Sequence, residues 1–193
     1  MEVLDKAVFL DRDGTINKEV NYLYKQEDFV FIPRTEEAIR IFRELGYKVI
    51  VITNQAGVAR GYFSEKDIKI LHQHMKDLLA AEGAYIDSYY YCPHHPEGSV
   101  ELYKKECTCR KPNIGMIEQA VKDFEIDLSD SIIVGDKEID IQTGKNAGIG
   151  TCVLVKCGHL VDENATVADM IFDNLYDLAI NLKNNSSIKE LIR

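Results

Sequence analysis

Two aspartates lie one residue apart, directly after a short apolar segment near the start of the chain. The segment Ala7–Leu10 (AVFL) precedes Asp11 and Asp13, and Gly14 follows them. Carboxylates at this spacing repel each other, and the end of a buried strand screens them poorly. A hard divalent cation such as Mg²⁺ relieves the repulsion and keeps coordination sites for phosphate oxygens. Since an aspartate can also attack phosphorus, the pattern predicts Mg²⁺-dependent phosphoryl transfer; a turn capped by aspartate side chains is the alternative.

A second polar group follows the apolar segment KVIVIT, which ends at Thr53. The Thr53 hydroxyl and nearby backbone N–H groups could hold phosphoryl oxygens there, although a polar strand end also simply terminates pairing. A few residues on, Gly57 and Gly61 bracket Arg60. This pattern indicates either a mobile basic loop that meets a phosphate or a solvated arginine.

Arg110 and Lys111 immediately precede Pro112 and a predicted helix. Cations at the start of a helix conflict with the macrodipole, which favours anions at that end. An anionic ligand would relieve the conflict, so the pair predicts phosphate binding rather than a solvated basic surface.

A further carboxylate, Asp136, follows the apolar segment SIIV. At the end of a strand it could complete a Mg²⁺ shell with Asp11 and Asp13, and Asp140, one helical turn later, could accept a hydrogen bond behind that shell. The alternative is that Asp136 caps the start of a helix.

Three cysteines and a histidine form two closely spaced pairs, Cys92 with His94 and Cys107 with Cys109. Three thiolates and one imidazole match a structural Zn²⁺ site in which the protein fills all four positions. His95 is adjacent, but the one-residue spacing within both pairs favours His94. Such a zinc loop would position the basic pair that follows it and would leave no open coordination site for chemistry.

The elements that must position these residues alternate along the chain between apolar strands and amphipathic helices. We expect strands at residues 7–10, 48–53, 88–91, 131–135 and 150–155. We expect helices at residues 35–45, 64–81, 113–124 and 139–147. Ser64 is the expected N-cap of the second helix, with Asp67 three residues on. The tail around residues 184–187 is read as a surface helix end or a frayed terminus.

Alternation of this kind predicts an α/β fold with a doubly wound, mostly parallel sheet. Ligands of such sheets bind beyond the carboxyl ends of the strands, where the polar groups at Asp11, Thr53 and Asp136 would converge. The 193 residues are interpreted as a single domain, 1–193, with an inserted zinc-binding loop at 92–109.

Composition narrows the possible partners and location. The formal net charge of -9 argues against a general nucleic-acid binder, which carries a basic face. No segment approaches the roughly 20 apolar residues of a membrane span, and Glu2 and Asp5 interrupt any signal peptide. Five cysteines in such a chain are more typical of ligands or buried thiols than of disulfides. We therefore expect a cytoplasmic, monomeric protein without nucleic-acid or membrane partners.

Taken together, the motifs FLDRDGT, VIVITNQAGVARG, CRKP and VGDKEID resemble the haloacid dehalogenase superfamily of phosphotransferases, in the same order. With CPHHP and CTC added, residues 7–155 are similar to the D,D-heptose 1,7-bisphosphate phosphatase family, whose relatives include histidinol phosphatases. The spacing leaves no room for a large cap domain between the motifs. The resemblance therefore implies the superfamily fold with an open site.

The resemblance also implies roles for the acidic residues. Asp11 is the expected nucleophile and a Mg²⁺ ligand. Asp13 is expected to offer its backbone carbonyl to Mg²⁺ and its side chain as general acid and then base. Asp136 is the third Mg²⁺ anchor. Many superfamily members carry a second carboxylate immediately after this one, where the present chain has Lys137, so the resemblance does not imply direct ligation by Asp140.

For the substrate, the resemblance implies that Thr53 and Lys111 hold the transferring phosphoryl group and that Arg110 recognises the phosphate that is retained. The other residues expected to bind substrate are Glu19, Val20, Asn21, Tyr22, Asn54, Gln55, Ala56 and Lys137. The ligands implied for Zn²⁺ are Cys92, His94, Cys107 and Cys109.

The function implied is hydrolysis of the C7 phosphate of a heptose 1,7-bisphosphate through an aspartyl-phosphate, in lipopolysaccharide or S-layer sugar synthesis. The alternative enzyme is a histidinol-phosphate phosphatase, which uses the same catalytic groups. The twelve-residue spacer between the zinc pairs and the additional cation Arg110 favour the bisphosphate. A non-catalytic, zinc-stabilised module that binds a phosphorylated ligand is a third hypothesis, which the presence of both Asp11 and Asp13 disfavours.

Overall fold

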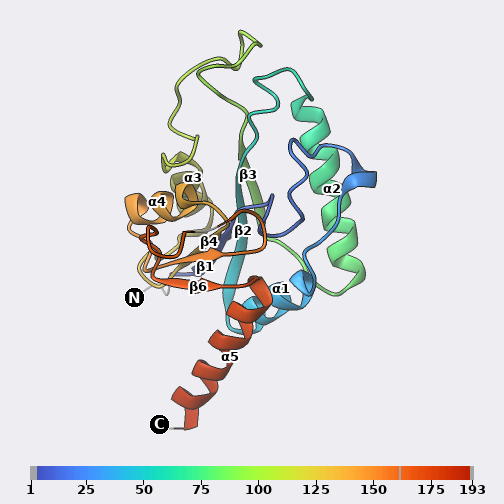
Figure 1. The fold of residues 1–193 in the computed structure, drawn as a ribbon. Helices are drawn as coiled ribbons and strands as arrows, with labels where there is room; N and C mark the ends of the chain where they lie inside the picture. The colour runs from blue at the N-terminus through green and yellow to red at the C-terminus, as the bar shows by residue number, and fades with distance from the viewer. Residues whose placement is uncertain (1–3, 161, 192–193) are drawn as a thin grey trace.

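A six-stranded parallel sheet forms the centre of the molecule in the computed structural model, which describes residues 4–160 and 162–191 (Figure 1). The strands are β1 (Lys6–Leu10), β2 (Tyr47–Asn54), β3 (Ser88–Cys92), β4 (Ile132–Gly135), β5 (Thr151–Val155) and β6 (Met170–Phe172). The helices are α1 (Thr35–Glu44), α2 (Glu65–Ala81), α3 (Gly115–Phe124), α4 (Glu138–Ala147) and α5 (Leu175–Leu191), with a short 3₁₀ turn at Gln26–Asp28. The predicted doubly wound α/β architecture is confirmed.

The strand order β3-β2-β1-β4-β5-β6 places β1 between the two halves of the sheet. Val8 of β1 is in register with Val49 of β2 on one side and with Ile132 of β4 on the other. The chain therefore reverses its winding direction between β1 and β4. A sheet of this kind binds ligands at such a switch point, beyond the carboxyl ends of the strands, and Asp11 follows the end of β1 there.

Helices cover both faces of the sheet, as Figure 1 shows for α3 and α4 on one side and α2 on the other. Alternate residues of β1 point to opposite faces, so Val8 and Leu10 pack in the core with α1, α2 and α5. Ala7 and Phe9 pack in the second core with α3 and α4. Burial on both faces explains why the central strands are continuously apolar rather than alternating.

The predicted elements are found with small shifts at their ends. The strand expected at 48–53 extends to Tyr47–Asn54, and the helix expected from residue 113 begins at Gly115. β6 and α5 were not predicted as elements. β6 has three residues at the edge of the sheet, too few for a periodic signal. In α5, buried Leu175, Leu178 and Ala179 have the i, i+3, i+4 spacing of a helix face, and this pattern could have revealed it.

The connections between strands carry the insertions. The segment between β3 and α3 includes the expected zinc loop, and the segment between β1 and α1 includes the expected substrate residues. Over residues 4–160 and 162–191, these insertions form no large cap domain, as the motif spacing predicted. Within the same residues, none of the helices combines the length and the apolar character that crossing a bilayer requires.

The N-terminus of α2 has the predicted cap. Asp67 N donates to Ser64 Oγ at 3.3 Å, and Ser64 N donates to Asp67 Oδ2 at 2.7 Å, which completes a capping box. Replacement of Ser64 by alanine is expected to lower the free energy of unfolding by about 1 kcal/mol, because one helix N–H loses its partner. Urea unfolding measures this change. Lys69→Ala, on an exposed position of the same helix, is the control and should shift stability by less than about 0.5 kcal/mol; equal effects would contradict the role of the cap.

Candidate active site

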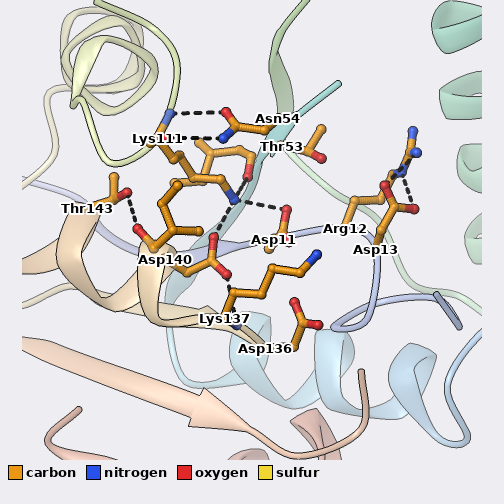
Figure 2. Close-up of polar contacts among 12 residues, drawn as sticks. Asp11, Arg12, Asp13, Thr53, Asn54, Lys111, Asp136, Lys137, Asp140 and Thr143 are labelled. Carbon is orange, nitrogen blue, oxygen red and sulfur yellow. Dashed lines mark hydrogen bonds and ion pairs between the residues drawn. The ribbon is translucent and has the colours of Figure 1, made fainter. Parts of the chain in front are cut away.

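A buried ion pair links the end of β1 to the segment before α3. Lys111 Nζ lies 2.9 Å from Asp11 Oδ1 and 2.5 Å from Asp140 Oδ1, and it donates to the carbonyl of Ile52 at 3.0 Å (Figure 2). The Lys111 side chain is only 2% exposed. Burial disfavours its charged form, but the Asp11 and Asp140 carboxylates outweigh burial and raise the pKa of Lys111. The lysine is therefore a fixed cation at the floor of the site.

Lys111 reaches this position by a route that differs from the sequence expectation. We expected the basic pair to lie at the N-terminus of the following helix, but α3 begins only at Gly115 and has Ile114 as its N-cap. Lys111 instead points back towards the sheet (Figure 2). Its charge therefore meets the carboxylates at the strand ends rather than the dipole of α3.

Asn54, at the end of β2, binds the backbone of Lys111 on both sides. Its Oδ1 accepts from Lys111 N at 3.0 Å, and its Nδ2 donates to Lys111 O at 3.2 Å (Figure 2). Asn54 lines the cavity as predicted, yet its amide is used to position the lysine. This pairing joins residues 57 positions apart, and no local sequence pattern reveals it.

The Asp13 carboxylate accepts hydrogen bonds from three side chains. Arg12 binds both oxygens, Asn17 Nδ2 donates to Oδ1 at 3.0 Å, and Gln55 Nε2 donates to Oδ2 at 3.0 Å. Gln55 Nε2 also donates to Thr53 Oγ1 at 2.9 Å, which ties the general-acid candidate to the phosphoryl-binding candidate. Burial favours the neutral form of Asp13, but the charge and hydrogen bonds of Arg12, together with the hydrogen bonds of Asn17 and Gln55, outweigh burial and lower the pKa of Asp13.

Asp136, at the end of β4, has a carboxylate oxygen that the described protein leaves unsatisfied. Its Oδ1 is buried without a hydrogen-bond partner, while Oδ2 contacts His159 Nδ1. A Cβ atom at Gly14 or at Gly158 would overlap this carboxylate, so both glycines allow the close approach. Burial and the negative charge of Asp11 raise the pKa of Asp136.

These residues fit a divalent cation. Oxygen atoms of Asp11, Asp136 and Asp140 all lie within 4.8 Å of one another, and the three side chains are buried. Three carboxylates face the single buried ammonium of Lys111, so a cation held by Asp11 and Asp136 would use the unsatisfied oxygen and reduce the repulsion. Asp140 is already bonded to Lys111 Nζ and to Lys137 N, at 3.2 Å, which suits a supporting position behind the metal.

A cavity of about 420 Å³ opens over this group. Most of the predicted residues line it, namely Asp11, Asp13, Glu19, Asn21, Tyr22, Thr53, Asn54, Gln55, Ala56, Arg110, Lys111 and Lys137. Val20 lines a neighbouring cavity instead and is 45% exposed. Gly57, Ile139 and His159 also line the cavity and were not predicted to do so; Gly57 and Ile139 lie within motifs noted in the sequence, whereas no motif marked His159.

Two arginines lie beside the zinc loop, and one of them lines the cavity. Arg110 lines the cavity and donates to the carbonyl of His94 at 3.4 Å. Arg60 is not among the lining residues, and its Nη2 lies 3.5 Å from His95 Nε2. The Arg60 loop therefore packs against the zinc loop. Elsewhere on the cavity wall, Lys137 Nζ lies 3.5 Å from Glu19 Oε2.

The predicted zinc ligands converge. Cys92 Sγ lies 3.0 Å from Cys109 Sγ and 3.5 Å from Cys107 Sγ, and His94 Nδ1 lies 3.4 Å from Cys109 Sγ. Atoms at the corners of a tetrahedron with metal–sulfur bonds of about 2.3 Å have comparable separations. His95 turns away, towards Arg60. The donor set and its geometry could hold one Zn²⁺ ion with no open position.

Comparisons with known proteins agree with this geometry. Residues 108–178 match the HAD-hydrolase-like family. D-glycero-alpha-D-manno-heptose-1,7-bisphosphate 7-phosphatase of Photorhabdus laumondii is 49% identical over 86% of this chain and 93% of the relative. D-glycero-beta-D-manno-heptose-1,7-bisphosphate 7-phosphatase of Haemophilus influenzae is 44% identical over 93% of this chain and 98% of the relative.

A solved structure shares the fold. D,D-heptose 1,7-bisphosphate phosphatase from B. bronchiseptica, complexed with magnesium and phosphate, superposes with a TM-score of 0.79 at 28% identity, over 93% of this chain and 99% of that one. The fold and the site define a phosphatase of the haloacid dehalogenase type. Within that class, the chain belongs to the D,D-heptose 1,7-bisphosphate phosphatase family.

A buried histidine lies behind the Asp13 group and makes stability depend on pH. His72 is 6% exposed, and burial, with the charges of Arg12 and Lys76, lowers its pKa from 6.5 to about 3, although Asp13 opposes the shift. In the unfolded chain, His72 therefore binds a proton below about pH 6.5. In the folded protein, His72 binds that proton only below about pH 3. Hence this residue makes stability fall as the pH falls through that window.

We expect the His72 contribution to reach a slope of about 1.4 kcal/mol per pH unit between pH 4 and 6. Urea unfolding of the wild type and of His72→Phe at several pH values measures it, since phenylalanine cannot take up the proton. The difference between the two free energies of unfolding should change with pH in this window and level off above pH 7. Parallel curves would contradict the neutral, buried state of His72.

Proposed function

We propose that the chain removes the C7 phosphate of D-glycero-D-manno-heptose 1,7-bisphosphate and releases heptose 1-phosphate, a step of nucleotide-heptose synthesis for lipopolysaccharide core or S-layer. One observation carries the proposal: the buried Lys111 ammonium lies 2.9 Å from the Asp11 carboxylate at the floor of a cavity, beside the unsatisfied oxygen of Asp136. The relatives are named for heptose bisphosphates, which disfavours histidinol phosphate. The acidic residues and the cavity disfavour a non-catalytic binding module.

In the first half of the reaction, Asp11 attacks phosphorus and forms an aspartyl-phosphate. Lys111 and the Thr53 hydroxyl hold the phosphoryl oxygens in line with the nucleophile. Asp13 donates a proton to the departing C7 oxygen. It is ionised in the free site, and the dianionic phosphate beside it raises its pKa, so that it takes up that proton when substrate binds.

In the second half, Asp13 is again a base. It removes a proton from the water that attacks the phosphorus of the aspartyl-phosphate, and the Asp11 carboxylate is regenerated. Lys111 stays within reach of the same oxygens throughout, because Asn54 fixes its backbone and Asp140 its ammonium. A Mg²⁺ ion held by Asp11, Asp136 and the Asp13 carbonyl would supply positive charge to the phosphoryl oxygens.

The retained phosphate needs its own cation. Arg110 lines the cavity and binds no carboxylate among the described residues, so it is the group we assign to the C1 phosphate. Lys137, Glu19, Asn21, Tyr22, Gln55 and Ala56 are assigned to the sugar and its phosphates. Val20 is 45% exposed and lines a neighbouring cavity, so we do not assign it to the substrate.

We infer that the preferred anomer is α. Two relatives named for the α-anomer are 49% and 47% identical to this chain, whereas six relatives named for the β-anomer are 42–44% identical. One organism, Photorhabdus laumondii, has a relative of each kind, at 49% and 44% identity.

Four expectations from the sequence stay predictions. These are a single domain over residues 1–193, a cytoplasmic location, a monomeric state, and the lack of nucleic-acid or membrane partners.

Phosphate release tests the activity. With Mg²⁺, the wild-type enzyme is expected to hydrolyse the heptose bisphosphate with a higher kcat/KM than histidinol phosphate, and the α-anomer faster than the β-anomer. Asp11→Asn removes the nucleophile and is expected to abolish turnover while circular dichroism and thermal stability stay close to the wild type. The assignment would be contradicted by substantial residual turnover in Asp11→Asn. It would also be contradicted if phosphate release continued unchanged after a chelator had removed Mg²⁺.

We infer that Cys92, His94, Cys107 and Cys109 bind one structural Zn²⁺. Cys107→Ser replaces a thiolate with a hydroxyl and is expected to lower zinc content and thermal stability first, with activity falling as Arg110 and Lys111 lose their support. Metal analysis and thermal unfolding measure this. Cys152→Ser, at a buried cysteine far from the cluster in sequence, is the control and should keep the zinc. If the purified wild-type enzyme contains no zinc, and added zinc does not change its thermal stability, the zinc site is refuted.

A further inference from the structure

Arg12 is a fully buried arginine that has no assigned role in the proposed reaction. It lies between the two reactive aspartates and is 0% exposed, the largest of the side chains buried to this degree. A buried guanidinium is costly unless charge and hydrogen bonds compensate it. Its contacts therefore indicate what it does.

The guanidinium of Arg12 binds the Asp13 carboxylate as a fork. Nε donates to Oδ1 at 3.1 Å and Nη2 donates to Oδ2 at 2.8 Å. Figure 2 shows the guanidinium of Arg12 beside the Asp13 carboxylate. Two parallel hydrogen bonds fix the plane of a carboxylate as well as its position. Asn17 and Gln55 add one bond each, at 3.0 Å, but neither is charged and neither spans both oxygens.

Two groups hold Arg12 from the other side. Nη1 lies 3.3 Å from His72 Nε2, and Nη2 donates to the carbonyl of Leu23 at 3.3 Å. Because His72 is neutral, its Nε2 can accept from Arg12, and its proton then resides on Nδ1. His72 belongs to α2 and packs against the Tyr89 ring of β3, with centroids 5.0 Å apart. The fork is thus anchored on an element that does not line the cavity.

We propose that Arg12, anchored by His72, is a positioning residue that orients the Asp13 carboxylate towards the leaving-group oxygen. The inference rests on the proposed role of Asp13 as general acid. Arg12 reaches the reaction only through Asp13, since its other contacts are His72 and the carbonyl of Leu23. It acts by restricting the rotation of a carboxylate that must face the C7 oxygen in one step and a water molecule in the next.

The leaving group provides a readout that a merely structural residue would not change. A sugar alkoxide needs a proton as the C7–O–P bond breaks, so kcat/KM for the heptose bisphosphate depends on the orientation of Asp13. 4-Nitrophenolate leaves without one, so kcat/KM for 4-nitrophenyl phosphate depends on it far less. The ratio of kcat/KM for the heptose bisphosphate to kcat/KM for 4-nitrophenyl phosphate therefore reports general-acid function. Changes in folding, metal content or phosphoryl binding affect both substrates and leave this ratio nearly unchanged.

We expect Arg12→Met to lower kcat/KM for the bisphosphate by about 10²-fold and to change kcat/KM for 4-nitrophenyl phosphate by only a few-fold. Arg12→Lys keeps the charge but loses the fork, and it should show nearly the same selective loss. His72→Phe leaves the cavity untouched and should show the same selectivity to a smaller extent. Arg40→Met, on α1 outside the site, is the matched arginine control and should keep the wild-type ratio.

Asp13→Asn distinguishes failure of the general-acid role of Asp13 from failure of the positioning role of Arg12. If Asp13→Asn does not lower the ratio, the general-acid assignment is wrong and the proposed function fails at that point. If Asp13→Asn lowers it, but Arg12→Met loses equally on both substrates or His72→Phe keeps the wild-type ratio, the positioning role is overturned. Should the wild-type enzyme not hydrolyse the bisphosphate, an alkyl phosphate that it does hydrolyse replaces it in the same comparison.

Discussion

The site depends on one electrostatic constraint, which is that three buried carboxylates lie close together beside one buried lysine, Lys111, and one half-buried lysine, Lys137. Asp11, Asp136 and Asp140 come from different elements and meet within 4.8 Å, and Lys111 bonds directly to only two of them. Uncompensated carboxylates in such a place are expensive. The surplus negative charge accounts for the affinity that a divalent cation would have there. It also accounts for the pKa of Lys111, which the carboxylates raise against the effect of burial.

The same constraint explains why so much of the surrounding structure positions Lys111. Asn54 binds its backbone on both sides, and the zinc-loop cysteine Cys109 lies two residues before it in the chain. A lysine on a free loop would lose conformational entropy on each encounter with a phosphate. Here that entropy is lost during folding, and the loop that carries the cysteine and histidine cluster leads directly into Arg110 and Lys111.

Asp13 is held by a separate group of side chains. Lys111 and Asp140 contact Asp11, whereas Arg12, Asn17 and Gln55 contact Asp13. Gln55 also bonds Thr53, and so links the two groups. Two carboxylates one residue apart are thereby placed in different environments, one beside a lysine and a metal site and the other in an arginine fork. Different environments are what two carboxylates with different tasks require.

Much of the fold and of the site was predictable from the sequence alone. Apolar strand segments and helix periodicity determined the doubly wound sheet, because a strand buried on both faces has to be continuously apolar. Asp11, Thr53 and Asp136 were predictable as neighbours, since they follow strands whose carboxyl ends meet at one edge. The convergence of Cys92, His94, Cys107 and Cys109 was readable from residue type and spacing, because a structural zinc site takes four soft or borderline donors close together.

Tertiary structure decided the contacts between residues far apart in the chain. No local pattern shows that Asn54 binds the Lys111 backbone, that Asp140 binds its ammonium, or that His72 of α2 lies behind Arg12. The expected meeting of Lys111 with a helix N-terminus was wrong, because α3 starts at Gly115 and the lysine turns back to the sheet. Sequence spacing reports which residues share an element or an edge. The direction of a side chain and its partner depend on how separate elements pack, and packing is a property of the whole fold.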